Sequence, residues 1–343
     1  MIMSDIIFAC GGTGGHVYPA IAIAQTLHSV GITFFVSTDR NDKEIVQAYG
    51  YSSFDIPSSN KNIIILLRGA IRAWLFLKQA NPKLLIATGG YHTAPIIIAA
   101  KLLKIPIILL EQNALPGRTN QYLAKLATHI CVSFPDSKKY LPSAILTGNP
   151  IRQKYRQEPL LDSLLATLSD YPTILIIGGS QGARGLNLFF DNHRGMVLSA
   201  SYNIIHLTGK SFFEAHFNGQ QPTFKDSRTG AVGIILPYCE DMKTLYNRSA
   251  IVISRAGATT IAELMAFQKK AILVPYPYAK DNHQYYNAEA FIQTGNGLIV
   301  EEQKLQKSNI LLQINMVLQQ PFKAQKLQYD PLFALGKLIQ DYV

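Results

Sequence analysis

Residues 6–15 read IIFACGGTGG and residues 173–182 read TILIIGGSQG, so one pattern occurs twice, once in each half of the chain. In both places an apolar run leads into Gly-Gly-(Thr/Ser)-x-Gly and then into a helical pattern. Glycine removes side chains where the backbone must approach a ligand, and free N–H groups at a helix N-terminus suit a phosphate. One copy is a weak signal. The pair predicts two open α/β domains that face each other across a ligand carrying a diphosphate.

The rest of the chain alternates β-rich and helical segments, which is typical of parallel sheets with crossover helices. The β-rich runs are continuously apolar, so we expect both faces of each sheet to be covered. The predicted strands are Ile6–Cys10, Thr33–Ser37, Leu84–Ala87, Ile107–Leu110, Ile130–Val132, Ala144–Leu146, Thr173–Ile177, Asn203–Leu207, Gly233–Leu236, Ile251–Ser254, Ala271–Val274 and Leu298–Val300. The predicted helices are Pro19–Leu27, Ala94–Leu103, Thr119–Ala127, Leu186–Phe190, Thr259–Phe267, Gln284–Thr294, Ser308–Leu318 and Leu332–Tyr342.

A chain of 343 residues is too long for one core, so two domains are expected. We place them at residues 1–150 and 161–343, with a linker at 151–160 and with packing of the last helix on the first domain left open. The net charge is +10, but the basic residues are scattered and form no recognition helix, which argues against nucleic acid as a partner. Three distant cysteines without CxxC spacing argue against disulfides and zinc and fit a reducing cytoplasm. No signal peptide is expected.

Residues 63–78 read IIILLRGAIRAWLFLK and come close to a membrane segment. Arg68, Arg72 and Lys78 interrupt the apolar stretches, so an uncharged span of about 18 residues is never reached. Two interpretations stay open: a helix packed on a sheet with its cations toward solvent, or a basic helix lying at an anionic interface.

Ligands of open α/β sheets bind beyond the carboxyl ends of the strands. The polar, non-helical residues of this chain concentrate at those positions, three clusters in each half, which predicts one site in the cleft between the domains. The clusters are Gly11–His16, Thr88–His92, Glu111–Asn113, Gly178–Arg184, Arg255–Glu263 and Lys280–Asn287.

The first glycine turn matches the dinucleotide fingerprint poorly, because Val17 stands where a third glycine or alanine is needed. Asp39, after the second predicted strand, keeps a dehydrogenase open. No complete Gly-x-x-x-x-Gly-Lys-(Ser/Thr) pattern is present, which excludes a P-loop, and no Asp-x-Asp indicates a metal-bridged diphosphate. Helix N-termini and Arg or Lys would then have to stabilise a leaving group's charge.

Several side chains of these clusters have two interpretations each. His16 is either a general base near neutral pH or a helix-start histidine bonded to the backbone. Glu111 ends an apolar strand, where a carboxylate serves a site or bonds to loop amides. Glu263 can take both hydroxyls of a ribose or cap its own helix. Residues 280–287 offer amides for sugar hydroxyls or form an exposed loop, and Tyr91-His92 line an acceptor cleft or cover the loop.

Taken together, the ordered motifs resemble the MurG family of N-acetylglucosamine (GlcNAc) transferases, from about residue 11 to residue 297. The resemblance implies the GT-B fold, with two Rossmann-like, doubly wound parallel-sheet domains, and a metal-independent enzyme without a cofactor. It also implies a basic-rimmed hydrophobic patch that meets anionic lipids on the cytoplasmic face of the bacterial inner membrane. The motifs are GGTGGHVYPA, TGGYHTAP, EQNALPGRTN, TGNPIR, IGGSQGARGLN, SRAGATTIAE and KDNHQYYNA.

The family function implied for this chain is transfer of GlcNAc from UDP-GlcNAc to the MurNAc 4-hydroxyl of lipid I (undecaprenyl-pyrophosphoryl-MurNAc-pentapeptide), giving lipid II for peptidoglycan. In the implied inverting step His16 is the first choice of base, and Glu111 aligns it or serves instead. The implied acceptor-diphosphate residues are Gly11, Gly12, Gly89, Gly90 and Tyr91. The implied donor residues are Thr13, Gly14, Gly15, Asn113, Arg152, Ser180, Cys239, Ala258, Thr259, Thr260, Ile261, Ala262, Glu263, Gln284 and Asn287.

Three residues depart from the family pattern. Leu110 stands where members commonly have histidine, Cys239 replaces an aliphatic residue in the segment that resembles a uracil contact, and His283 replaces a glutamine of some relatives. Two other functions remain as alternatives. A UDP-GlcNAc 2-epimerase of similar fold would act on the same donor without lipid, and a non-catalytic membrane adaptor would explain residues 63–78 but leave both glycine turns unused.

Overall fold

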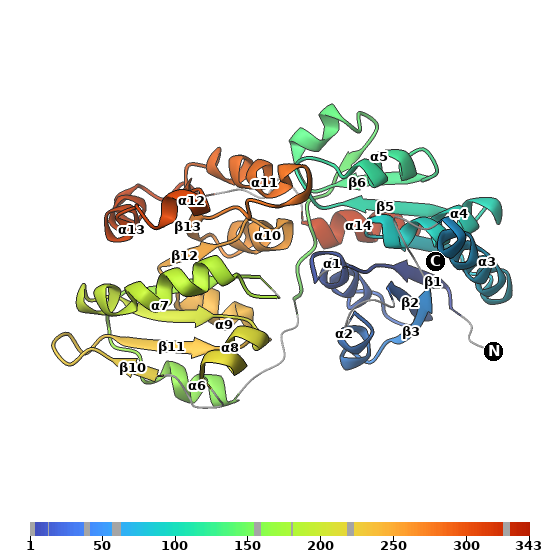
Figure 1. The fold of residues 1–343 in the computed structure, drawn as a ribbon. Helices are drawn as coiled ribbons and strands as arrows, with labels where there is room; N and C mark the ends of the chain where they lie inside the picture. The colour runs from blue at the N-terminus through green and yellow to red at the C-terminus, as the bar shows by residue number, and fades with distance from the viewer. Residues whose placement is uncertain are drawn as a thin grey trace. The chain divides into compact units, whose positions relative to one another are not determined.

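The computed structural model describes residues 4–12, 14–37, 42–56, 63–153, 159–179, 181–217, 223–324 and 330–343. Its contacts divide the chain into two compact units, one of residues 1–153 with 328–343 and one of residues 154–327. Each unit is built around one twisted sheet with helices on both faces (Figure 1). Thr13, Asp39, Ser180 and residues 154–158 of the expected linker lie outside the described residues.

The first sheet has the strand order β3-β2-β1-β4-β5-β6-β7, and all its neighbouring strands pair in parallel. The chain starts in the middle, moves out to one edge and returns to build the other side. The order therefore reverses between β1 and β4, which is the switch point where doubly wound sheets bind ligands. The strands are β1 (Ile6–Ala9), β2 (Ile32–Ser37), β3 (Ser52–Ile56), β4 (Leu84–Ala87), β5 (Ile107–Glu111), β6 (His129–Val132) and β7 (Ile145–Leu146).

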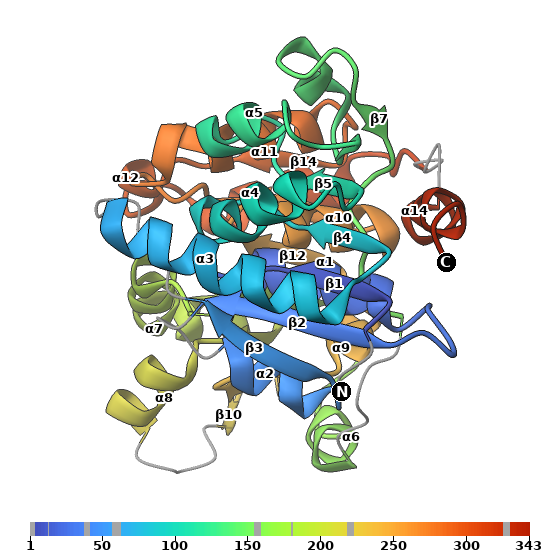
Figure 2. The same ribbon diagram turned by 90° about the vertical axis from the view of Figure 1, so that its right-hand side faces the viewer.

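Alternate residues of β1 supply two separate cores. Ile6 and Phe8 pack with α1 and with α14 at the end of the chain. Ile7 and Ala9 pack on the opposite face with α3 and α4 (Figure 2). The chain's last helix thus completes the core of the first unit. The helices are α1 (Gly14–Ala24), α2 (Asp42–Ala48), α3 (Ile63–Ala80), α4 (Ala94–Leu102), α5 (Arg118–Leu123) and α14 (Pro331–Gln340), with 3-10 turns η1 (Tyr91–Thr93) and η2 (Pro135–Lys139).

The second sheet repeats the plan with the order β10-β11-β9-β8-β12-β13-β14. Its neighbours pair in parallel except at the β10–β11 edge, which is antiparallel. Its switch point lies between β8 and β12, beside the second glycine turn. The strands are β8 (Thr173–Ile177), β9 (Asn203–Leu207), β10 (Thr223–Lys225), β11 (Val232–Leu236), β12 (Ile251–Ser254), β13 (Lys270–Leu273) and β14 (Gly297–Ile299).

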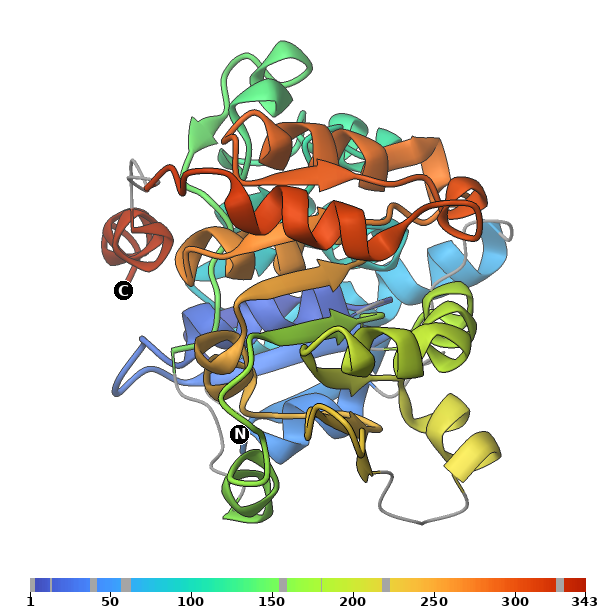
Figure 3. The same cartoon turned by 90° about the vertical axis from the view of Figure 1, so that its left-hand side faces the viewer.

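On one face of this sheet, α7 and α13 cover Ile174 and Ile176 of the first strand (Figure 3). Two aromatic residues of α7, Phe189 and Phe190, are fully buried there. On the order of 2–3 kcal/mol comes from each such buried side chain. The helices of the unit are α6 (Pro159–Leu165), α7 (Arg184–Ser199), α8 (Lys210–Phe217), α9 (Met242–Arg248), α10 (Ala258–Ala266), α11 (His283–Ile292), α12 (Glu302–Leu305) and α13 (Ile310–Gln319), with the 3-10 turn η3 (Lys280–Asn282).

Helix α1 differs most clearly from the sequence-based expectation, because it begins at Gly14 rather than at Pro19. Proline is favoured at the first helical position, which is why the pattern suggested a start there. In the structure Pro19 lies inside the helix and forgoes one backbone hydrogen bond. In return, the first turn of α1 begins within the glycine motif, so its N–H groups lie at the switch point.

Helix α3 buries one narrow stripe and exposes another. Ala73 and Leu77 are fully buried against the sheet. The apolar side chains on the far side are exposed together with the cations, so α3 packs on the sheet through one stripe and presents a second apolar stripe at the surface. No helix of the described residues is long and apolar enough to cross a membrane.

Candidate active site

The first glycine turn follows β1 and is packed by side chains of its own unit. Gly12 has φ +93°, and a Cβ there would lie 2.7 Å from the His92 ring. Its N–H donates to Asp42 Oδ2 at 2.8 Å. Asp42 is 3% exposed and begins α2. The Gly12 amide is therefore already engaged by a carboxylate, although the sequence assigned it to a diphosphate, and the adjoining Gly11 and Gly14 are buried.

His16 lies in the first turns of α1, beside the loop that follows β4. Its Nδ1 lies 2.8 Å from the carbonyl oxygen of Thr88. A carbonyl can only accept, so Nδ1 carries the proton and donates. The neutral ring then has its lone pair on Nε2, which lies 3.7 Å from the position of a Gly90 Cβ. His16 is therefore bonded to the backbone, as one interpretation expected. The same bond orients Nε2, the atom that a general base would use.

The Gly89-Gly90 turn depends on Asn120. Both glycines have φ near +85°, and a Cβ on Gly89 would collide with the Asn120 amide. The Gly90 N–H donates to Asn120 Oδ1 at 2.9 Å. The rings of Tyr91 and His92 stack next to this turn with centroids 3.7 Å apart. Glycine here makes room for a neighbouring side chain.

Glu111 ends β5 and is 2% exposed. Its Oε1 accepts from the backbone and side-chain N–H groups of Asn113 at 2.9 and 3.2 Å. Its Oε2 accepts from Gly117 N at 3.1 Å and Asn120 Nδ2 at 2.8 Å. Burial raises the pKa of the Glu111 carboxyl, against the lowering effect of these four N–H groups. Glu111 connects through Asn120 to the Gly90 turn.

Arg152 is 5% exposed and lies against two tyrosines of the first unit. Its Nη1 donates to the Tyr49 hydroxyl at 2.7 Å, and its Cζ lies 4.2 Å from the centroid of the Tyr18 ring. This planar cation is stacked and hydrogen-bonded, as guanidinium groups often are. The structure thus packs it against α1 and against the residue that follows α2.

The second glycine turn follows β8 and packs against backbone. A Cβ on Gly178 would collide with Ala183 N, and one on Gly182 with the Thr208 carbonyl. Gly182 N donates to Gly179 O at 2.9 Å, which closes the turn. Gly179 has φ +87°, and within the described part of the chain nothing lies within 4 Å of the position of its Cβ. One face of this turn is open, next to the N-terminus of the 16-residue helix α7.

Helix α10 follows β12 through Arg255-Ala256-Gly257. Glu263, in its second turn, is 8% exposed and accepts from the Tyr246 hydroxyl at 2.9 Å. The Glu263 carboxylate thus bonds to a side chain of α9. Ile261 is fully buried in the core, so any ligand contact there uses the backbone. Ala258 is also buried, whereas Thr259, Thr260 and Ala262 are partly exposed.

Helix α11 supports the same turn from the other side. Asn287 is fully buried, and its Nδ2 donates to Ala256 O at 3.1 Å. Gln284 Oε1 accepts from Tyr276 N at 3.0 Å. These two amides, assigned from the sequence to sugar hydroxyls, hold the loops at the carboxyl edge of the second sheet. Asp281 and Asn282 precede them with φ of 50° and 54°, a left-handed pair that turns the chain sharply into α11.

The three cysteines are all buried. Burial raises the pKa of the Cys131 thiol to about 12 and raises that of Cys10 as well, with a smaller contribution from Asp42. Thiols held neutral in this way are poor nucleophiles. Cys239, in the segment before α9, is 1% exposed, so its side chain belongs to the core.

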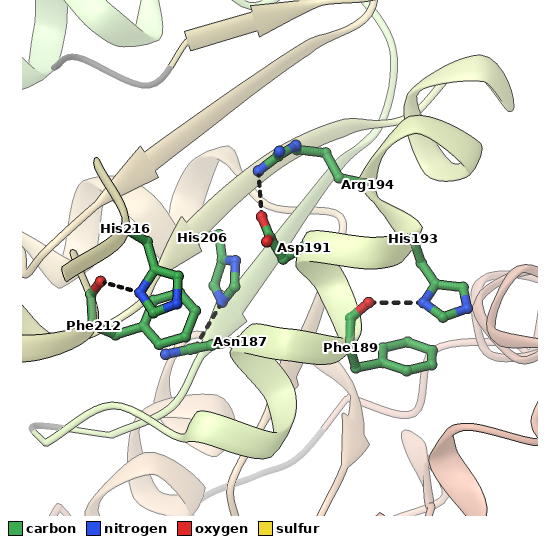
Figure 4. A network of polar contacts seen from close by, with 8 residues as sticks. All are labelled: Asn187, Phe189, Asp191, His193, Arg194, His206, Phe212 and His216. Atoms are coloured by element: carbon green, nitrogen blue, oxygen red, sulfur yellow. Dashed lines mark hydrogen bonds and ion pairs between the residues drawn. The ribbon is translucent and has the colours of Figure 1, made fainter. Parts of the chain in front are cut away.

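A polar network links α7 to β9 beneath the second glycine turn (Figure 4). His206 is buried, and its Nε2 lies 3.1 Å from Asn187 Oδ1. Asn187 Nδ2 donates to Thr208 O at 2.7 Å, the carbonyl against which Gly182 packs. Burial, followed by the charge of Arg194, lowers the pKa of His206 to about 3. The ring is therefore neutral and donates from Nε2.

Among the residues that the structure describes, no three His, Cys, Asp or Glu side chains gather into a metal-ligand set. Sequence reasoning missed two residues that hold these loops: Asp42 at the first glycine turn and Asn120 at the Gly89-Gly90 turn. Asn120 stands within the quoted EQNALPGRTN motif, so motif membership was the available signal for it. Nothing in the sequence marked Asp42, whose partner lies 30 residues away.

Two family models match the chain, one in each unit. Residues 6–132 match the glycosyltransferase family 28 N-terminal domain, and residues 173–330 match the glycosyltransferase family 28 C-terminal domain. With two doubly wound sheets and a glycine turn at each switch point, they define a glycosyltransferase of the GT-B fold.

Relatives of similar length narrow this class. A protein of Desulfotalea psychrophila is 34% identical over 97% of this chain and 95% of its own length, and one of Prochlorococcus marinus is 28% identical over 98% and 93%. Both carry the name UDP-N-acetylglucosamine–N-acetylmuramyl-(pentapeptide) pyrophosphoryl-undecaprenol N-acetylglucosamine transferase. The chain belongs to this transferase family, the MurG family, within glycosyltransferase family 28.

Solved structures agree with the fold. MurG of Acinetobacter baumannii superposes with a TM-score of 0.70 at 26% identity, covering 98% of this chain and 99% of that one. A UDP-GlcNAc 2-epimerase from Neisseria meningitidis superposes with a TM-score of 0.65 at 11% identity, covering 98% and 99%. At that identity the likeness to the epimerase concerns the fold alone.

Proposed function

We propose that this protein transfers GlcNAc from UDP-GlcNAc to the MurNAc 4-hydroxyl of a pyrophosphoryl-undecaprenol acceptor, lipid I, which gives lipid II for peptidoglycan. The observation that carries the proposal is 34% identity over nearly the full length to a transferase named for this donor and acceptor. The epimerase alternative has only fold likeness at 11% identity in its support.

The second unit is proposed to bind the donor. The open face of Gly179 and the N-terminus of α7 offer backbone N–H groups to the diphosphate, together with Ser180. Glu263 is proposed to take the ribose hydroxyls, because its carboxylate lies one turn inside the helix that follows the Arg255–Gly257 turn. Residues 258–262 and 239 would meet the nucleotide, and Gln284 and Asn287 the sugar. Arg152 is proposed to lie near the donor.

The first unit is proposed to supply the base. The acceptor hydroxyl attacks C1 of GlcNAc on the side opposite UDP, so the C1–O bond to UDP breaks as the new β-1,4 bond forms. His16 Nε2 takes the hydroxyl proton, since Thr88 fixes the proton of the ring on Nδ1. Thr13, Gly14, Gly15 and Asn113 are proposed to close on the donor sugar. The loops at 11–12 and 89–91 are proposed to hold the acceptor's diphosphate through groups other than the engaged Gly12 and Gly90 amides.

Glu111 is proposed to position this site. Its carboxylate oxygens are saturated by four N–H groups, and one of them belongs to Asn120, which shapes the Gly90 turn. Although burial raises the pKa of the Glu111 carboxyl, both of its oxygens are occupied by these N–H groups. Its contribution therefore runs through the loop that faces His16 Nε2.

The exposed face of α3 is proposed to rest on anionic lipids at the cytoplasmic face of the inner membrane. Ile64, Leu67, Ile71 and Leu75 follow one another at helical spacing, each between 55 and 59% exposed. The exposed cations of α3 alternate with them. An amphipathic helix of this kind binds interfaces through its apolar face, with about 1 kcal/mol from each nearby cation.

The transfer is tested with radiolabelled UDP-GlcNAc and a short-chain lipid I analogue. Label in the lipid product supports the proposal. Label in free N-acetylmannosamine would contradict it and indicate a UDP-GlcNAc 2-epimerase. Unchanged UDP-GlcNAc would contradict it and indicate a non-catalytic membrane adaptor.

Sedimentation with phosphatidylglycerol vesicles tests the membrane face. The double variant Leu67→Ser/Ile71→Ser should lose most of its binding, while Leu312→Ser, equally exposed on α13, should bind as the wild type does. Equal loss in both variants would contradict a docking face on α3.

A further inference from the structure

An ion pair between a buried arginine and a partly exposed glutamate joins the loops at the carboxyl edge of the second sheet. Arg255 follows β12, is 7% exposed, and its Nη2 lies 2.7 Å from Glu302 Oε2. Its Nη1 donates to the carbonyl oxygens of Val274 and Pro275 at 3.1 and 3.3 Å. One guanidinium thus connects the ends of β12 and β13 to the first residue of α12.

The other side of the Glu302 carboxylate lies against α7. A Cβ on Gly185 would collide with Glu302 Oε1 and would lie 2.7 Å from its Cδ. Gly185 is in the first turn of α7, three residues after the glycine turn ends at Gly182. Any side chain at position 185 would occupy the space that the Glu302 carboxylate fills, so this arrangement requires glycine there.

The pair therefore spans both segments to which the donor is assigned. Through Gly185 it touches the helix that follows the diphosphate turn, and through Arg255 it touches the turn that leads into α10 and Glu263. A carboxylate near a helix N-terminus is favourable, and the buried guanidinium of Arg255 loses its counter-charge if the carboxylate is removed. Loss of one partner lets each loop relax separately.

We propose that Glu302 is a positioning residue for the donor: its carboxylate holds Arg255 and the first turn of α7 in one fixed arrangement, so that the diphosphate turn and the ribose-binding helix stay in register. This inference rests on the proposed function. Glu302 acts through Arg255 and Gly185 and needs no contact with the donor itself.

Two variants disturb the arrangement from opposite sides. Glu302→Gln removes the charge that holds Arg255. Gly185→Ala pushes the carboxylate away from α7, although alanine is a better helix former than glycine. Each has a matched control in the chain. Glu301→Gln removes an adjacent carboxylate whose partner is the exposed Lys304, and Gly195→Ala adds a methyl group to α7 where no described atom lies within 4 Å.

The readout is the Kd of UDP, measured by calorimetry on the full chain, with thermal unfolding measured in parallel. We expect Glu302→Gln and Gly185→Ala each to raise this Kd by about tenfold, as displaced binding groups do, and both controls to stay within about twofold of the wild type. The KM of the lipid acceptor should not move. Gly185→Ala should lose affinity without losing thermal stability, which a merely structural role of the pair does not produce.

If Gly185→Ala binds UDP with the Kd of the wild type, the inference is overturned. This holds whether or not the Glu302→Gln protein folds. An acceptor KM that rises together with the UDP Kd would also overturn it. If the wild type binds no UDP at all, the proposed function fails, and this inference fails with it.

Discussion

The two glycine turns are spelled alike, but their glycines make room for different things. In the first turn, a Cβ on Gly12 would meet the His92 ring, and in the loop beside it a Cβ on Gly89 would collide with Asn120. In the second turn, Gly178 and Gly182 make room for backbone, and Gly179 faces open space. The first arrangement brings side chains together and the second leaves peptide groups accessible. Under the proposed function, the first arrangement serves proton transfer and the second binds an anionic ligand.

The acidic side chains beside the two turns also have different bonding partners. Asp42 binds the Gly12 N–H directly. Glu302 lies against α7 but is paired with the buried Arg255. The charge of Glu302 is balanced by a guanidinium, whereas Asp42 accepts a hydrogen bond from a neutral amide. Glu302 therefore repels an approaching diphosphate less than Asp42 does. This difference favours the second unit as the donor's site.

Loss of His16 should have the largest effect and should be confined to the chemistry. His16→Ala removes the oriented Nε2, so kcat should fall about 10²–10⁴-fold, the usual contribution of a general base. The Kd of UDP should not change, because His16 is assigned to the acceptor hydroxyl and not to UDP. Steady-state turnover and calorimetry measure the two quantities. His28→Ala, an exposed histidine of the same unit, is the control, and turnover in His16→Ala close to its value would refute the assignment.

The open glycine of the second turn should give the reverse pattern. Gly179→Ala places a methyl group where the diphosphate is proposed to bind. Hydrogen bonds to charged groups contribute about 1.5–3 kcal/mol, so the Kd of UDP should rise about 10- to 100-fold. Gly50→Ala is the control, since Gly50 has a φ of +81° and equally open space among the described atoms of the first unit. If both variants bind UDP equally well, the second turn does not hold the diphosphate.

Glu111 and Asn120 should be energetically coupled, because Asn120 bonds both to Glu111 and to the Gly90 turn. If Glu111 acts through Asn120 and the Gly90 turn, then Glu111→Gln and Asn120→Ala should lower kcat by similar factors, about tenfold each, through a loosened loop. Their double variant should be little worse than either one, because coupled residues are not additive. The comparison uses kcat at saturating substrates. A Glu111→Gln variant as damaged as His16→Ala, beside a nearly intact Asn120→Ala, would make Glu111 the base instead.

The smallest effect concerns stability in the second unit. The pKa of His206 is lowered from 6.5 to about 3 in the folded chain, so the unfolded chain binds a proton first as the pH falls. The neutral ring's contribution is complete above pH 6.5 and is lost between 6.5 and about 3. His206→Gln keeps a donor for Asn187 but does not titrate. One pH unit below 6.5, urea unfolding should show the wild type losing about 1.4 kcal/mol more than this variant. Parallel pH profiles would contradict a buried neutral ring.

Much of the fold could be predicted from the sequence because its central strands are continuous apolar runs. The predicted strands at 84–87, 173–177, 203–207 and 251–254 coincide with β4, β8, β9 and β12. The edge strands β3 and β10 were missed, since SSFDI and TFK carry polar residues and their partners decide their conformation. The short helices α2, α8 and α9 were missed for the same reason: tertiary packing, more than local pattern, stabilises helices of seven or eight residues.

The site divides in the same way. Glycine motifs and polar strand ends located His16, Glu111 and Glu263 without any structure. Sequence reasoning did not find Asp42, Asn120 or Glu302, whose contacts bridge 30 or more residues and depend on which loops the sheet brings together. Local pattern thus selects candidate site residues. The residues that hold them in place emerge only from the fold.

The central claim is that the second glycine turn binds the diphosphate of UDP and the first does not. Hydrogen exchange on the full chain, with and without saturating UDP, tests this claim most directly. The account predicts protection by UDP at residues 178–185 and 256–263 and none at residues 11–16. Protection at 11–16 with unchanged exchange at 178–185 would contradict it.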